Sequence, residues 1–279
     1  MTMTPPPDTR LPVPDTPGPR DDQHPYLILT LRRTGGTSLM AFLSRVSAFP
    51  SIQHEPFNPD RVWGGLRVGF EGRYDTPDFA AALAGHLAEH PNIKHCIELV
   101  APDLTAALID ACAARGYRLF LLLRHQETAR LRSLCLAQLT GAWGRQQVAR
   151  IYPQILSGAM PLSPVDIAAL NRHARRDAQA LATVRAMLET ANRSYQTLFF
   201  EEIYARDGLL PNRACALAAQ LGVTVAPDDP RLEVLTKPPG IPASRILPFV
   251  PNADALEVAL KRIDAPEQRG AVLKPRPAP

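Results

Sequence analysis

The segment Arg32–Ser38, with the sequence RRTGGTS, combines residue types that bind anions. Glycine lets the backbone come close to a ligand, and the hydroxyl groups of threonine and serine can donate hydrogen bonds. Arginine adds a permanent charge and a forked set of donors that suits oxyanions. We therefore expect a phosphate-like group to bind here through Arg32, Arg33, Thr34, Gly35, Gly36, Thr37 and Ser38.

A strand before this segment and a helix after it would hold it in place. Tyr26–Leu29 is an apolar, β-forming run, and apolar residues then recur at helical spacing at Leu39, Phe42, Leu43 and Val46. A glycine-bearing turn between strand and helix points backbone N–H groups and the positive helix end at an anion. An ordinary tight turn is the simpler alternative, but the neighbouring arginines and hydroxyl groups favour anion binding.

The segment lacks the lysine of the kinase and NTPase phosphate loop, G-x-x-x-x-G-K-[ST]. Thr37 follows Gly36 where that loop has lysine, and Leu31 stands where the first glycine would be. An atypical kinase of this class, which would bind ATP with magnesium, is therefore kept only as an alternative.

His54 and Glu55 form a second group of chemically active side chains, just before Pro56. Proline favours extended backbone before it and ends regular pairing, so both residues are expected at the end of a short strand around Ile52. In α/β sheets, ligands bind at strand ends beside a phosphate loop. Neighbouring residues on extended backbone point to opposite sides, so one of the two would face the site. A solvated pair in a loop is the alternative.

Arg124 and Ser133 form a third group. Tyr117–Leu123 is a near-continuous apolar run, typical of a buried parallel strand, and Arg124 follows where it ends. Ser133 would lie about two and a half turns into the next helix. A strand-end arginine and a helix hydroxyl could hold one phosphate between them, although serine is also a common packing residue in helices.

These segments resemble motifs of sulfotransferases that use 3′-phosphoadenosine 5′-phosphosulfate (PAPS). RRTGGTSL is similar to their 5′-phosphosulfate loop, usually Pro-Arg/Lys-Ser/Thr-Gly-Ser/Gly-Thr, with Arg32 in place of the proline. In that family a strand-end arginine and a serine eight or nine residues later hold the 3′-phosphate of PAPS, which corresponds to Arg124 and Ser133. The A-x-x-T-G-x-W pattern of Ala137–Trp143 resembles the bacterial carbohydrate group typified by trehalose 2-sulfotransferase.

The resemblance implies transfer of a sulfuryl group from PAPS to a hydroxyl of a carbohydrate or other small molecule, with Arg33 in the catalytic loop. Glu55–Phe57 matches the E-x-F segment whose glutamate is the base in the bacterial enzymes, and other sulfotransferases use a histidine, which keeps His54 as second candidate. PAPS is the implied co-substrate, and no metal is implied. The basic C-terminal loop that closes over PAPS in many members would correspond to Lys237 or Arg245, although the R-K-G pattern is missing. A non-catalytic binding module on the same fold is a further alternative.

Alternating strand and helix patterns up to Leu123 predict a doubly wound α/β fold. The resemblance narrows this to a P-loop-like three-layer fold, with a central parallel sheet in a domain over residues 25–265 and a helical insertion at about residues 145–192. Residues 1–24 are rich in proline and polar residues and are expected to be a disordered tail, and residues 266–279 a frayed end.

Three local expectations concern the regions between these motifs. Trp63–Tyr74 is rich in glycine and arginine and is predicted to be a loop that crosses the surface or, alternatively, contacts the acceptor. Ile151–Pro164 contains three prolines and is predicted to be irregular. Lys94, on a strand predicted over Asn92–Leu99, is expected to be solvated rather than part of the site.

Composition limits the classes of partner. A net charge of +4 without a concentrated basic patch suits a small anionic ligand and argues against nucleic acid. The chain lacks a signal-peptide pattern and an apolar run of about 18 residues, so a soluble cytoplasmic protein is expected. The sequence leaves the oligomeric state open, a homo-oligomer included. Widely spaced cysteines in apolar stretches predict buried free thiols rather than a zinc site, at Cys96, Cys112, Cys135 and Cys215.

Overall fold

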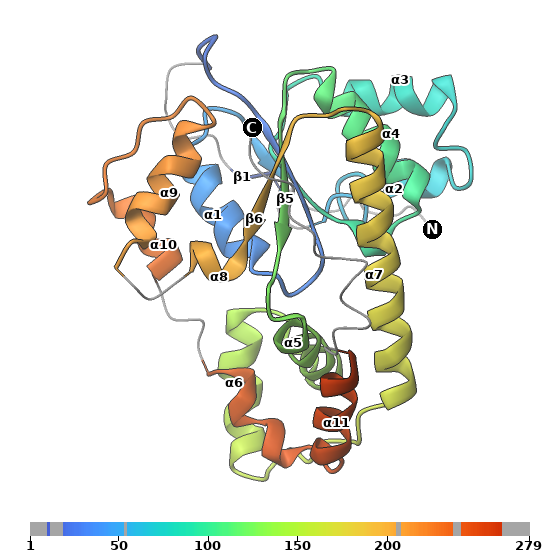
Figure 1. Ribbon diagram of the computed structural model, residues 1–279, viewed down its shortest axis with the longest axis vertical. Coiled ribbons are helices and arrows are strands. Elements are labelled where there is room, and N and C mark those ends of the chain that lie inside the picture. Colours follow the sequence, from blue (N-terminus) through green and yellow to red (C-terminus); the bar gives the residue numbers. More distant parts are fainter. Residues whose placement is uncertain (1–9, 12–18, 53–54, 205–207, 237–240, 264–279) are drawn as a thin grey trace, which may run out of the picture. The chain divides into compact units, whose positions relative to one another are not determined.

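The computed structural model describes residues 10–11, 19–52, 55–204, 208–236 and 241–263 (Figure 1). The chain forms two compact units. The first comprises Met1–Leu123 and Thr183–Thr236, and the second Arg124–Ala182 and Lys237–Pro279. The second unit thus begins earlier than the predicted insertion at residues 145–192, and it includes the C-terminal part of the chain.

The first unit is built on a parallel sheet of four strands in the order β4-β2-β5-β6. Thr30 in the central strand pairs with Cys96 on one side and with Leu122 on the other, so the carboxyl ends of three strands meet at one edge. The sheet confirms the α/β class with parallel strands. Its strands are β2 (Tyr26–Thr30), β4 (Ile93–Cys96), β5 (Arg118–Leu123) and β6 (Tyr195–Phe199).

Helices cover both faces of this sheet (Figure 1). On one face, Ile28, Phe120 and Leu198 form an apolar core with helices α1, α9 and α10. Helix α4 lies on the other face, where its Thr105 contacts His95 of β4, and α3 packs against α4. Burial on both faces explains why β2 and β5 read as continuous apolar runs. The bounds of these helices are α1 (Gly36–Val46), α3 (Pro77–His86), α4 (Pro102–Ala113), α9 (Leu210–Ala219) and α10 (Glu233–Thr236).

Part of the predicted tail is structured. Strand β1 (Arg10–Leu11) pairs antiparallel with β3 (Ser51–Ile52), which confirms the short strand expected around Ile52. The Arg20 guanidinium donates to the carbonyl oxygen of Gly222 at 3.1 Å, and the His24 amide donates to that of Leu221. These contacts tie residues 20–24 to the end of helix α9.

The loop predicted at Trp63–Tyr74 is wrong in part, because Gly64–Gly69 forms helix α2. Trp63 is only 1% exposed and packs edge-on against Phe57, with ring centroids 5.2 Å apart. Gly64 is needed for close packing, since a Cβ there would lie 2.4 Å from the Asn58 carbonyl oxygen. Gly64 thus allows the helix to contact the backbone at Asn58 closely, whereas the sequence suggested that glycine marks a surface loop here.

The second unit is helical, and its elements surround a separate apolar core. The irregular stretch predicted at Ile151–Pro164 is wrong over its first residues, because α6 continues to Leu156 with Pro153 inside it. Proline costs a helix about 3 kcal/mol. Burial of an apolar side chain stabilises the fold by roughly 1.5–3 kcal/mol. Tyr152 and Ile155 are both buried in the core, which offsets the effect of the proline. The helices are α5 (Glu127–Thr140), α6 (Arg145–Leu156) and α11 (Ala253–Ile263), with α7 (Ile167–Thr190) shared between the units.

A buried ion cluster joins two helices of the second unit. Arg130 of α5 is almost fully buried and donates to Asp177 of α7 at 2.7 Å and to Glu127 on its own helix. These carboxylates raise the pKa of Arg130 despite its burial, so the guanidinium stays charged. The cluster fixes α5, the helix that carries Ser133, against the first part of α7.

Within the described part of the chain, no helix is long and apolar enough to cross a membrane. Of the cysteines, Cys96, Cys112 and Cys135 are buried and Cys215 is partly buried, all as free thiols. The prediction of free thiols is confirmed. Cys96 lies beside the charged side chains of Glu55 and Lys94.

Two neighbouring glycines of α2 test the packing at Trp63. Gly64→Ala is expected to lower the free energy of unfolding by roughly 1–3 kcal/mol, because the added methyl group meets fixed backbone oxygens. Gly65→Ala is the matched control, since a Cβ there meets nothing within 4 Å, and it should be neutral or stabilising by up to about 1 kcal/mol. Urea unfolding measures both. Equal effects of the two changes would contradict this packing.

Candidate anion-binding site

The predicted anion segment lies where β2 passes into α1, at the carboxyl edge of the sheet. Gly35 caps the helix in the left-handed region, with φ 86°, and Arg33 is also left-handed, with φ 67°. A Cβ on Gly35 would be strained and would lie 2.5 Å from the ring of Phe200. Glycine is therefore required at position 35, both for its backbone and for the ring that packs against it.

The start of α1 is suited to a negative charge. The N-cap residue, Gly35, has no side chain with which to cap the first amides, and the first turn of the helix contains no acidic residue. The first amides of a helix lack partners within it, and the helix dipole makes this end positive. Thr37 is exposed and Ser38 half-buried at this end. Thr34 has a different place: its hydroxyl is buried and donates to the Leu31 carbonyl oxygen at 2.8 Å, so it stabilises the turn.

The short helix α8 (Phe200–Ile203) packs against the turn from β6. The hydroxyl group of Tyr204 donates to the Gly35 carbonyl oxygen at 3.0 Å. Burial raises the pKa of Tyr204, although hydrogen bonds with Leu39 and Ser38 act in the opposite direction, so the group stays a donor at neutral pH. Phe200 and Tyr204 therefore hold Gly35 in its left-handed conformation.

Glu55 is joined to this turn through Lys94. The Lys94 ammonium lies 2.6 Å from Glu55 Oε1, and the Cys96 thiol donates to the same oxygen at 3.0 Å. The Lys94 stem reaches Gly36, where an added Cβ would lie 3.0 Å from Lys94 Cδ. The expectation of a solvated lysine was wrong, since Lys94 is only 6% exposed. Lys94 and Cys96 share one face of β4, the face on which α1 packs.

The pKa shifts in this group follow from burial and charge. Burial alone would raise the pKa of Glu55, but the charge of Lys94 and hydrogen bonds from Cys96 and Lys94 outweigh it and lower the pKa. Burial likewise opposes the Lys94 charge, yet the carboxylates of Glu55 and Glu98 raise the pKa of Lys94. Burial raises the pKa of Cys96 well above its usual value. At neutral pH the site therefore holds a carboxylate, an ammonium and a neutral thiol.

Glu98, which the sequence did not single out, holds the other side of the turn. Its Oε1 accepts hydrogen bonds from both the backbone amide and Nε of Arg32, each at 2.9 Å. Glu98 lies in the 3-10 turn η1 (Ile97–Leu99) directly after β4. The one available signal in the sequence was a carboxylate near the end of the strand predicted over Asn92–Leu99.

His95 points away from this group, as the alternation of a strand requires. Its Nε2 lies 3.0 Å from the hydroxyl oxygen of Thr105 on α4. Burial lowers the pKa of His95 to about 4, so this histidine is neutral at physiological pH. It belongs to the packing of the opposite face.

The other predicted site residues belong to the second unit or lie outside the described residues. Arg124 follows β5 directly and opens the second unit, and Ser133 lies within α5 of that unit. Arg245 is exposed at the end of η3 (Ala243–Arg245), also in the second unit. His54 and Lys237 lie outside the described residues. The structure thus brings together the turn and Glu55, and the role of Arg124 and Ser133 stays a prediction.

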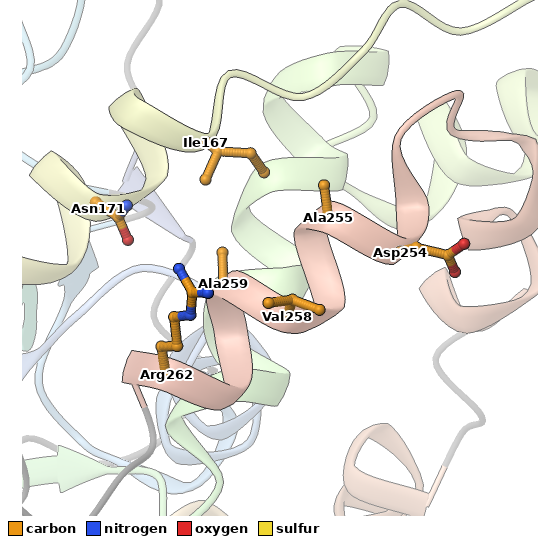
Figure 2. A pocket seen from close by; sticks show the side chains of 7 residues that line it. All are labelled: Ile167, Asn171, Asp254, Ala255, Val258, Ala259 and Arg262. Atoms are coloured by element: carbon orange, nitrogen blue, oxygen red, sulfur yellow. The ribbon is translucent and has the colours of Figure 1, made fainter.

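A pocket of about 370 Å³ lies in the second unit, between the start of α7 and α11 (Figure 2). Its walls are mostly apolar, and Asp254, Asn171 and Arg262 are its polar residues. In Figure 2 the Asp254 carboxylate and the Arg262 guanidinium lie at opposite ends of the pocket-lining face of α11. Among the described residues, none predicted for catalysis or nucleotide binding lines this pocket.

A scan of family models, a search of curated proteins and a search of solved structures each find no match to this chain. Among the described residues there is also no group of three or more His, Cys, Asp or Glu side chains able to hold a metal ion. What the site binds must be inferred from its own residues.

The Glu55–Lys94 pair predicts a defined pH dependence of stability. The pKa of Glu55 is depressed in the folded state, so its contribution is present above its ordinary pKa of 4.5 and is lost as pH falls through the lower folded value. Glu55→Gln should reduce the free energy of unfolding at neutral pH by roughly 1–3 kcal/mol, because Lys94 loses its partner. The difference from wild type should shrink steadily below pH 4.5.

Urea unfolding at a series of pH values measures this difference. Glu71→Gln, which removes a carboxylate from an exposed position, is the matched control and should change stability little at any pH. A Glu55→Gln effect that stayed constant down to about pH 3 would show that the ion pair does not stabilise the fold.

Proposed function

We propose that this protein transfers a sulfuryl group from PAPS to a hydroxyl of a carbohydrate or other small molecule. One observation carries the proposal: Lys94 joins the carboxylate of Glu55 to Gly36, at the uncapped start of α1. An anion site, a cation and an ionised carboxylate therefore occur together in the first unit. Group transfer between a bound phosphosulfate and an alcohol needs these three components.

The helix start would hold the phosphosulfate. In-line transfer requires a fixed donor and charge neutralisation on the departing phosphate. The amides of the first turn, the Arg33 guanidinium and the Lys94 ammonium supply positive charge there. Because Lys94 is buried and paired with Glu55, it is already oriented before a ligand binds.

Glu55 would take the proton from the acceptor hydroxyl. Lys94 and Cys96 both contact Oε1, so Oε2 is the oxygen that would receive the proton. The lowered pKa keeps Glu55 ionised at neutral pH and also makes it a weak base. Such a base suits a reaction in which the hydroxyl becomes acidic as its oxygen bonds to sulfur.

Arg124 and Ser133 would bind the 3′-phosphate of PAPS. Because Leu122 pairs with Thr30, strand β5 ends level with the start of the phosphate turn, and Arg124 is the second residue after Leu122. In this proposal the first unit is a P-loop-like three-layer fold, and the helical insertion at about residues 145–192 falls mostly within the second unit.

A kinase is the second candidate, and Lys94 is the observation that favours it. P-loop kinases place an ammonium at the start of the helix that binds phosphate, and in this chain β4 could supply one that the turn itself lacks. A kinase would depend on ATP with magnesium, which separates the two candidates by ligand.

Ligand-dependent stabilisation is the first test of the proposal. 3′-Phosphoadenosine 5′-phosphate is expected to raise the melting temperature in a concentration-dependent manner, because a ligand that binds only the folded state stabilises it. ATP with magnesium should have a much smaller effect. Differential scanning fluorimetry measures both. Stabilisation by ATP with magnesium alone would favour the kinase, and no response to either ligand would favour a non-catalytic module.

Arg124 is the residue that tests the 3′-phosphate assignment. Arg124→Gln should weaken binding of 3′-phosphoadenosine 5′-phosphate by about ten- to a hundredfold, the cost of about 1.5–3 kcal/mol for a charged hydrogen bond. Binding of adenosine 5′-phosphate should change little. Arg172→Gln removes the same charge from an exposed position in the same unit and should change neither affinity. Calorimetric titration measures these affinities, and equal losses for both nucleotides would refute the assignment.

A further inference from the structure

Glu98 is a buried carboxylate that the proposed chemistry does not use. Its side chain has no exposed surface, and one oxygen, Oε1, receives both hydrogen bonds from Arg32. The other oxygen, Oε2, is buried and meets no hydrogen-bond donor among the described residues. A buried carboxylate that accepts hydrogen bonds at only one of its two oxygens lowers the stability of the fold. Its place beside the turn therefore needs an explanation.

The two bonds to Arg32 act on different parts of that residue. The bond from the backbone amide fixes the path of the chain as it leaves β2, and the bond from Nε fixes the guanidinium. The next residue, Arg33, has φ 67°, which a side-chain-bearing residue rarely adopts. A left-handed residue persists only where its surroundings hold it, and Glu98 anchors the residue immediately before it.

A comparable anchor holds the other end of the turn. Tyr204 donates to the carbonyl oxygen of Gly35, two residues after Arg33. The turn is therefore fixed on both sides of Arg33, by Glu98 from the end of β4 and by Tyr204 from beyond β6. Both anchors come from outside the turn and are distant from it in sequence.

We propose that Glu98 is the positioning residue of the anion-binding turn. It retains Arg32 as part of the scaffold, so that Arg33 and the first amides of α1 face the anion. This inference rests on the proposed function, since it takes the sulfur-bearing end of PAPS as the anion. The two adjacent arginines then have different roles, Arg32 in the scaffold and Arg33 beside the anion.

Because Glu98 is charged, the direction in which anion affinity changes on its replacement tests its role. A carboxylate near a bound anion repels it, so if Glu98 were only a nearby charge, its removal would tighten anion binding. If Glu98 positions the turn, its removal loosens the turn and weakens binding, although a repulsive charge is lost. The two views predict opposite changes for the same variant.

The experiment compares Glu98→Gln with wild type in calorimetric titrations with 3′-phosphoadenosine 5′-phosphate. Glutamine keeps the shape of the side chain and an acceptor oxygen but not the charge, so both bonds from Arg32 lose their charge assistance and weaken. We expect the dissociation constant to rise on the order of tenfold. Thr105→Val is the matched control, because it removes one buried hydrogen bond, to His95 on the opposite face of β4. It should lower the melting temperature without changing the affinity.

The double variant shows whether Glu98 acts through Arg32. If it does, Glu98→Gln combined with Arg32→Gln should bind no more weakly than the weaker of the two single variants, because both changes act on the same bond between the Arg32 guanidinium and Glu98. If Glu98→Gln does not fold, Arg32→Lys provides the second test, since lysine keeps the charge but lacks the Nε–H that Glu98 binds. The same weakening is expected from this variant.

The outcomes are separable. Unchanged or tighter binding by Glu98→Gln, with wild type binding normally, overturns the positioning role and leaves the proposed function intact. Additive losses in the double variant overturn the action through Arg32. Failure of the wild-type protein to bind 3′-phosphoadenosine 5′-phosphate overturns the proposed function, and this inference with it.

Discussion

The ion pair between Lys94 and Glu55 is the interaction on which the site depends. It places an ammonium against Gly36 and a carboxylate at the same sheet edge, although the two residues come from different segments. Each charge makes the burial of the other acceptable, since an unpaired charge at either position would be strongly disfavoured. Substituting one partner therefore disturbs both the anion site and the candidate base.

The local part of this arrangement could be predicted from the sequence. The strand at Tyr26–Thr30, the turn and the helix that begins at Gly36 follow from apolar periodicity and two glycines, signals that lie within one short stretch. The anion segment needed no knowledge of the rest of the chain, and the parallel α/β class followed from strands alternating with helices.

The long-range part could not be predicted in the same way. Lys94 and Glu98 reach the turn because β4 pairs with β2 in one register, with Thr30 opposite Cys96. A shift of one residue would direct Lys94 to the opposite face, and no local pattern fixes that register. Trp63–Tyr74 shows the same limit, since Gly64, one of the glycines that suggested a loop, is required by a close contact with the Asn58 carbonyl oxygen. The burial of Lys94 was missed because a charged residue on a strand is usually solvated.

The central claim is that the turn holds the 5′ end of the nucleotide, which carries the sulfuryl group in PAPS. Phosphorus NMR tests this claim most directly. 3′-Phosphoadenosine 5′-phosphate gives separate resonances for its two phosphates, so each end of the ligand reports on its own surroundings. With wild-type protein both resonances should shift on binding. With Gly35→Ala, which places a methyl group against Phe200, the 5′ resonance should stay at its free position while the 3′ resonance still responds. A 5′ resonance that shifts equally in both proteins would contradict the assignment.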